Sequence, residues 1–242
     1  MNHEFSIQVF GEECVLLNWP PEIDPDIHQN VVQMDEFICA NFQKEISETI
    51  LGYHSLMVQL KAPYTQQEFL SEIKNITTIE KVQSLGSNYL FRIPVCYNED
   101  YGLDLNQLSE EKQLGISEII KLHTQPIYPV YFIGFLPGFP YLGGLHEKLY
   151  MPRKKEPRTQ ITAGSVGIGG NQTGIYPLNS PGGWNLIGRT PISLFSKNIQ
   201  PPALLKAGDR IQFQSIDKNE FARISEAIQK KTYGIEQEVW ND

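Results

Sequence analysis

The stretch AGSVGIGGNQTGIYPLNSPGGWNLIGRT, residues 163–190, indicates the fold class of the C-terminal part of the chain. Its apolar residues come in short runs, and glycine or proline interrupts them repeatedly. Many short strands joined by Gly/Pro turns are typical of a β-barrel or a β-sandwich. Twelve of the 19 glycines lie between Gly134 and Gly188, so the loop-forming residues concentrate here.

The chain upstream of this region alternates between strand-like and helix-like patterns. Phe5, Ile7 and Val9 alternate with polar residues, as in a half-buried strand. Asp24-Pro25 is typical of a helix start, and Thr65-Gln66-Gln67-Glu68 fits a capping box. The order strand-strand-helix-strand-strand-helix predicts a small α+β sandwich, with two helices on one face of an antiparallel sheet.

Charge separates these two parts of the chain. Residues 1–85 carry a net charge of −9, whereas residues 86–242 carry +1. We therefore predict two domains, an N-terminal α+β domain over 1–85 and a β-barrel domain over 86–242. In the second domain the patterns predict a helix cap at Ser117 and further elements, namely strands at Tyr89–Val95, Val130–Ile133, Ile192–Phe195 and Arg210–Ile216 and a helix at Lys218–Lys231.

Composition excludes several classes of function. The 242 residues carry a formal net charge of −8, whereas sequence-independent nucleic-acid binding needs a basic face. No window approaches the roughly 18 apolar residues of a membrane span, and the first residues lack the features of a secretory signal. We therefore expect a cytoplasmic protein. The three cysteines form no CxxC pair and no HExxH is present, so no metal site is expected.

The glycine-rich stretch fails the tests for two familiar motifs. A Walker A loop would need Lys-Ser/Thr after Gly169, where Gly170-Asn171 stands. Residues 163–167 approach the Gly-x-Ser-x-Gly motif of a nucleophilic serine, but a glycine pair follows where that motif needs a helix.

A dense set of polar, aromatic and glycine residues remains as the candidate site. We expect the arginines to form forked pairs with a ligand carboxylate. The other polar and aromatic side chains could form hydrogen bonds with a ligand or stack on it. The glycine loops could donate backbone N–H groups to it. The predicted binding side chains are Arg158, Gln172, Thr173, Tyr176, Ser180, Trp184 and Arg189, and the loop positions are Gly138, Gly164, Ser165, Gly182 and Gly183. The alternative is structural: the glycines turn barrel corners, Arg189 pairs with a neighbouring acid, and the basic run at 148–158 is a solvated loop.

Taken together, the motifs resemble a known family. They are GFLPGFPYLGG at 134–144, PR at 157–158, AGSV at 163–166, QTGIYP at 172–177 and SPGGWNLIGRT at 180–190. In this order they resemble the family of the 5-oxoprolinase B subunit, which is also labelled allophanate hydrolase subunit 1 and includes the sporulation kinase inhibitor KipI.

The resemblance implies an N-terminal α/β domain and a cyclophilin-like C-terminal barrel. It also implies a heteromeric enzyme in which this chain acts with the 5-oxoprolinase C subunit, of related barrel fold, and with the A subunit. That enzyme cleaves 5-oxo-L-proline to L-glutamate with ATP, and the pair of barrels resembles the carboxyltransferase part of urea carboxylase. We predict His123 and Arg189 as catalytic residues, His123 because an ordinary histidine pKa suits proton transfer near neutrality. A histidine at a helix end that satisfies backbone groups is the structural alternative.

Two other functions stay open at this point. The resemblance to KipI allows a protein that inhibits a sensor histidine kinase by binding, without catalysis. Urea or allophanate metabolism is weaker, because the chain has neither a biotin-attachment motif nor an amidase signature. No nucleotide-binding motif is present, so the ATP site is expected on, or shared with, another protein of the complex.

Overall fold

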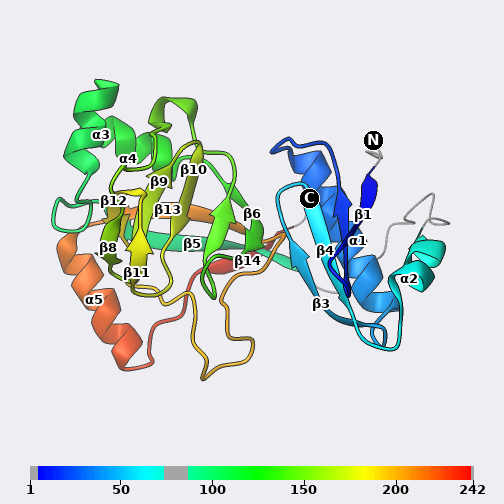
Figure 1. The fold of residues 1–242 in the computed structure, drawn as a ribbon. Helices are drawn as coiled ribbons and strands as arrows, with labels where there is room; N and C mark the ends of the chain where they lie inside the picture. The colour runs from blue at the N-terminus through cyan, green and yellow to red at the C-terminus, as the bar shows by residue number, and fades with distance from the viewer. Residues whose placement is uncertain (1–4, 74–86, 241–242) are drawn as a thin grey trace. The chain divides into compact units, whose positions relative to one another are not determined.

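The computed structural model describes residues 5–73 and 87–240. The chain divides into two compact units, Met1–Ser87 and Asn88–Asp242, each described by itself below (Figure 1). The predicted domain boundary between residues 85 and 86 lies outside the described residues. Within the described residues, no helix is both long and apolar enough to cross a bilayer.

The N-terminal unit is one four-stranded antiparallel sheet with two helices. Its strand order is β1-β2-β4-β3, and every neighbouring pair is antiparallel. Its elements are β1 (Ser6–Phe10), β2 (Cys14–Asn18), α1 (Pro25–Asn41), β3 (Ile46–Leu51), β4 (Ser55–Leu60) and α2 (Gln66–Ile73).

Strand alternation and helical spacing build one core in this unit. Every second residue of β2 and β4 is buried, and these residues share a hydrophobic cluster with α1 and α2. Both helix starts carry the predicted caps. Asp24 Oδ1 accepts from Asp26 N at 2.8 Å, and Thr65 and Glu68 exchange the reciprocal bonds of a capping box.

The C-terminal unit contains a closed barrel. Its elements are β5 (Asn88–Cys96), α3 (Leu105–Lys112), α4 (Ile116–Thr124), β6 (Tyr128–Ile133), β7 (Pro140–Leu142), the 3₁₀ turn η1 (Glu147–Leu149), β8 (Arg158–Ile161), β9 (Ser165–Gly169), β10 (Gln172–Ile175), β11 (Ser180–Gly182), β12 (Asn185–Arg189), β13 (Arg210–Ile216), α5 (Lys218–Gln229) and β14 (Gln237–Trp240). The strands pair in the order β12-β9-β10-β7-β6-β13-β5-β14. Pairing of Arg189 with Cys96 joins β12 to β5 and closes the ring, which leaves β14 as an added strand on β5.

The predicted α+β fold with an N-terminal sandwich and a C-terminal barrel is therefore confirmed. Strands β8 and β11 form a separate pair beside the barrel. Figure 1 shows α3 and α4 together at one end of the barrel, with α5 beside it. Apolar residues from most of the strands fill the interior, Ile93, Val130, Val166 and Ile211 among them.

Two local predictions are wrong. Residues 192–195 form no barrel strand, because Leu194 O accepts from Leu204 N within a local loop and only Phe195 makes an isolated bridge. The apolar character of this run reflects burial of Leu194 in the core. Ser117 does not cap α4, since Gly115 is the N-cap residue and the helix has already begun at Ile116.

The Asp24 cap provides a test of the local signals. Asp24→Ala removes the acceptor for two amides of the first turn of α1, so we expect a loss of about 1 kcal/mol from local stability. Hydrogen exchange of residues 25–41 should then become faster. Asp24→Asn keeps an acceptor and should exchange almost as slowly as the wild type; equal exchange rates in all three proteins would contradict the assignment.

Candidate functional site

A buried carboxylate, Asp104, holds together the segments around the candidate site. Asp104 is only 3% exposed. Oδ1 accepts from Lys154 Nζ at 2.7 Å and from Arg158 Nη2 at 2.8 Å, while Oδ2 accepts from Arg158 Nη1 at 2.8 Å and from the amide of Leu186 at 2.7 Å. One carboxylate therefore links the start of α3 to the 154–158 segment and to β12.

Asp104 is ionised at neutral pH. Burial by itself would raise the pKa of this carboxyl, but hydrogen bonds from Arg158, Lys154 and the Leu186 amide together lower the pKa below its ordinary value. The sequence predicted that Arg158 would bind a ligand carboxylate. In the structure, both terminal nitrogens of Arg158 donate hydrogen bonds to Asp104 instead. Asp104 was not identified from the sequence, where it is one acid between two leucines.

The largest gathering of predicted site residues lies at a hollow of about 280 Å³, which we call the aromatic hollow. Aromatic side chains, proline rings, two glycines and one cation surround it. They are Phe135, Phe139, Tyr141, Arg153, Pro157, Tyr176, Pro181, Gly182, Gly183 and Trp184. Four of these, Tyr176, Gly182, Gly183 and Trp184, were predicted from the sequence as site residues.

Edge-to-face packing fixes the walls of the aromatic hollow. The Phe139 ring meets Tyr176 at 5.4 Å and Trp184 at 5.5 Å between centroids, both at 81°. Gly169 lets the indole lie against β9, because a Cβ at this position would stand 2.4 Å from Trp184 Nε1. Phe139, Tyr176 and Trp184 thus pack against one another in the structure, and largely preformed walls are typical of small-molecule sites.

Arg153 supplies the positive charge of the aromatic hollow. Its guanidinium carbon lies 5.8 Å from the centroid of the Trp184 ring, a cation–π arrangement. Within the part of the chain that the structure describes, no carboxylate forms an ion pair with Arg153. Lys154 N donates to Gly183 O at 2.7 Å, which holds the Arg153 segment beside Trp184. The sequence pattern places Arg153 only in a basic run, and its position over an indole was not predictable from spacing.

Other predicted residues lie elsewhere. Gly164 and Arg189 line a second hollow. Ser165 is buried in the first position of β9, and Gly138 occupies a turn between β6 and β7 with φ of 81°. Gln172 is half-buried at the start of β10.

Ser180 differs from these residues because its hydroxyl is unsatisfied. The residue is 7% exposed, and its Oγ has no hydrogen-bond partner among the described residues. A buried hydroxyl without a partner is costly, so this atom is a natural contact for water or a ligand.

His123 and Thr173 lie inside the barrel. Neither residue is exposed, and His123 Nε2 lies 2.9 Å from Thr173 Oγ1 while Nδ1 lies 2.7 Å from Tyr97 Oη. Thr173 Oγ1 donates its proton to Gly167 O, so it accepts from Nε2–H. In the neutral ring, Nδ1 therefore carries no proton and accepts from Tyr97 Oη, so the contacts select the tautomer with its proton on Nε2.

Burial lowers the pKa of His123 to about 3. Proton transfer near neutrality needs a histidine pKa close to its ordinary value, and full burial moves the pKa of His123 away from that value. The structural alternative expected the ring to bond backbone carbonyls. In the structure, the hydroxyls of Tyr97 and Thr173 form the hydrogen bonds with the two ring nitrogens. A catalytic role for His123 stays a prediction, and the observed contacts are those of a core residue.

The Asp104 cluster makes a stability prediction. Asp104→Asn leaves two partly buried cations without their counter-charge, so we expect a loss of about 3–5 kcal/mol in unfolding free energy at pH 7. Because the folded pKa is lowered, the contribution of Asp104 is present above its unfolded pKa, about 3.9, and is lost as the pH falls further. Asp100→Asn, which breaks only an exposed pair with Lys218, is the control and should shift the urea midpoint far less than Asp104→Asn. Equal urea midpoints for the two variants would refute this role.

His123 predicts a pH dependence. In the unfolded chain His123 is protonated below about pH 6.5, whereas in the folded chain it stays neutral down to about pH 3. The unfolded state therefore binds more protons between these pH values, and the stability of the wild type falls as the pH drops through this window. His123→Gln cannot titrate. We therefore expect the wild-type advantage over His123→Gln to shrink by up to about 1.4 kcal/mol per pH unit below 6.5. Urea unfolding at pH 7, 6 and 5 measures this difference, and parallel curves would argue against it.

Comparisons with known proteins agree with the motifs and the barrel. Residues 5–205 match the family described as carboxyltransferase domain, subdomain C and D. The chain is 34% identical over 232 residues to the 5-oxoprolinase B subunit of Bacillus subtilis, which covers 91% of this chain and 97% of that protein. It is 44% identical over 171 residues to the 5-oxoprolinase B subunit of Haemophilus influenzae, with 71% and 80% covered.

A solved structure shows the same fold at low identity. Urea carboxylase of Kluyveromyces lactis superposes with a TM-score of 0.76 at 19% identity, over 98% of this chain and 24% of that one. At this identity the likeness concerns the fold alone. The matched family and the two relatives carry the assignment, and the resemblance found in the motifs is confirmed. The chain belongs to the family of the 5-oxoprolinase B subunit.

Proposed function

We propose that the chain is the non-autonomous B subunit of an ATP-dependent 5-oxoprolinase and acts in the cytoplasm with the A and C subunits of that enzyme. The complex would cleave 5-oxo-L-proline to L-glutamate. The names of the relatives support a role in such an enzyme. These names do not favour the alternative of a kinase inhibitor, and no feature of the described residues adds support for it.

The observation that carries the proposal is the position of Arg153 over the Trp184 ring at the aromatic hollow. 5-Oxoproline is a small flat lactam with one carboxylate. Aromatic walls suit the ring, and a guanidinium without an ion-pair partner suits the carboxylate. Tyr176, Trp184 and the backbone at Gly182 and Gly183 would then contact the substrate. A contact of Ser180 with the substrate stays a prediction, because Ser180 is not among the residues that line the aromatic hollow.

The chemistry explains why partners are needed. A lactam is a stable amide, and transfer of a phosphoryl group from ATP to its oxygen makes the carbonyl carbon open to attack by water. Addition of water, loss of phosphate and cleavage of the C–N bond give glutamate. Because this chain has no nucleotide-binding motif, we place the ATP site on a partner or between the proteins of the complex. The proposed task of this chain is to hold and orient the lactam.

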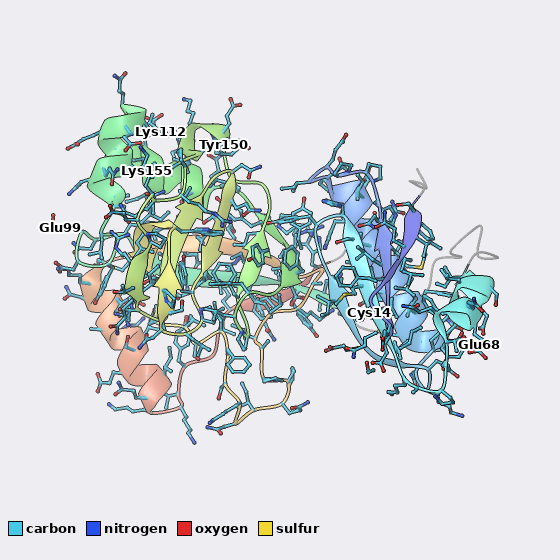
Figure 2. All side chains as sticks on the ribbon, in the orientation of Figure 1. Cys14, Glu68, Glu99, Lys112, Tyr150 and Lys155 are labelled. Carbon is cyan, nitrogen blue, oxygen red and sulfur yellow. The ribbon has the colours of Figure 1, made fainter. Side chains whose placement is uncertain are left out.

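Reconstitution tests the proposal. The purified A and C subunits should release ADP in a 5-oxoproline-dependent manner only when this chain is added. Arg153→Gln should raise KM for 5-oxoproline about tenfold or more, because a charge-assisted contact is lost. Lys155→Gln, an exposed neighbour labelled in Figure 2, removes the same charge two positions away and should leave KM unchanged.

Two results would overturn the proposal. Full turnover by the other two proteins without this chain would show that it is not part of the enzyme. Equal KM values for Arg153→Gln and Lys155→Gln would show that the aromatic hollow does not hold the substrate carboxylate.

A further inference from the structure

A second hollow, of about 320 Å³, lies between the barrel and α5, and we call it the Arg189 hollow. The turn at Ala163–Gly164, the end of β12 and the 190–193 segment form one side of it. The other side is one face of α5, where Phe221, Ser225 and Gln229 recur at helical spacing. Among the described residues that line this hollow, Arg189 is the one with a charged side chain.

The guanidinium of Arg189 is held in place but not neutralised. Its Nε donates to Ala163 O at 3.1 Å, and its Cζ lies 5.8 Å from the centroid of the Tyr101 ring. Tyr101 in turn stacks on Phe221, with centroids 4.7 Å apart and planes at 29°. Across residues 5–73 and 87–240, no carboxylate pairs with Arg189, so the neighbouring acid of the structural alternative is not found.

The backbone beside Arg189 is built for one conformation. Gly164 has φ of 84°, donates its amide to Tyr176 O at 2.7 Å and accepts from Thr190 N at 2.9 Å. A Cβ at Gly164 would stand 2.4 Å from Thr190 O, so only glycine allows this close approach. The turn presents the Ala163 carbonyl to Nε and thereby orients the two terminal nitrogens, which donate to no other described residue.

We propose that the Arg189 hollow binds the carboxylate or phosphate group of a small ligand, gripped by the terminal nitrogens of Arg189. A guanidinium that is pre-oriented by an aromatic ring and by one backbone bond, with its fork open, matches planar or tetrahedral oxyanions. The site shares no lining residue with the aromatic hollow and does not rest on the proposed function. The competing explanation is purely structural: Arg189 fastens α5 to the barrel through Tyr101 and Phe221.

The test is titration of the full-length chain with inorganic phosphate and, separately, with acetate, at constant ionic strength, followed by NMR chemical shifts. Saturable shifts are expected at Gly164, Arg189 and the 190–193 segment, and the tighter of the two anions identifies the preferred group. Arg189→Gln should weaken binding about tenfold or more. Arg223→Gln is the matched control, since this exposed arginine lies on the opposite face of α5 and loses the same charge.

A second pair of variants covers the case in which Arg189→Gln unfolds. Ser193 is exposed and lines the hollow, so Ser193→Asp places a repelling carboxylate there while Arg189 remains, and Ser193→Asn is its neutral counterpart. Weaker binding by Ser193→Asp alone supports the site. Absence of saturable shifts in the wild type, or equal weakening by Arg223→Gln, overturns it.

Discussion

The four hydrogen bonds to the Asp104 carboxylate are the contact on which the candidate site depends most. They join segments that lie 50 to 82 positions apart in the chain. A buried charge is tolerated only where partners neutralise and hydrogen-bond it, so Lys154, Arg158 and the Leu186 amide must be in place together. Lys154 also donates its backbone N–H to the carbonyl of Gly183, the residue before Trp184. This bond places the neighbouring Arg153 beside the Trp184 ring.

Polar residues in the glycine-rich motifs perform different tasks in the folded unit. Thr173 and His123 satisfy each other inside the barrel, where burial makes a charged imidazole costly. Tyr176 and Trp184 stand at the edge of the aromatic hollow, and Arg189 stands at another hollow. Residues that are neighbours in sequence point to different sides of a strand, so a single motif serves the core and the surface at once.

Helix caps and strand alternation were predicted correctly, because each depends on residues close together in the chain. The Asp24 cap and the Thr65–Glu68 capping box involve residues three positions apart or fewer, and strand alternation needs only a period of two. The failures have non-local causes: residues 192–195 are apolar because Leu194 is packed into the core, not because they pair in the barrel. In the candidate site, aromatic and glycine positions were found, whereas Asp104 and Arg153 were not.

The sequence by itself determined the fold class, the family and the region in which a ligand site must be sought. Periodicity, caps and glycine-rich motifs are local properties, and several long motifs in one order identify a family. Only the tertiary structure decided which polar residues face a hollow and which partner each charge takes. Pairing of Arg189 with Cys96 closes the barrel, and a separate set of hydrogen bonds joins Asp104 to Arg158 across 54 positions of the chain. Such pairings depend on contacts between residues far apart in the chain, which spacing along the sequence does not encode.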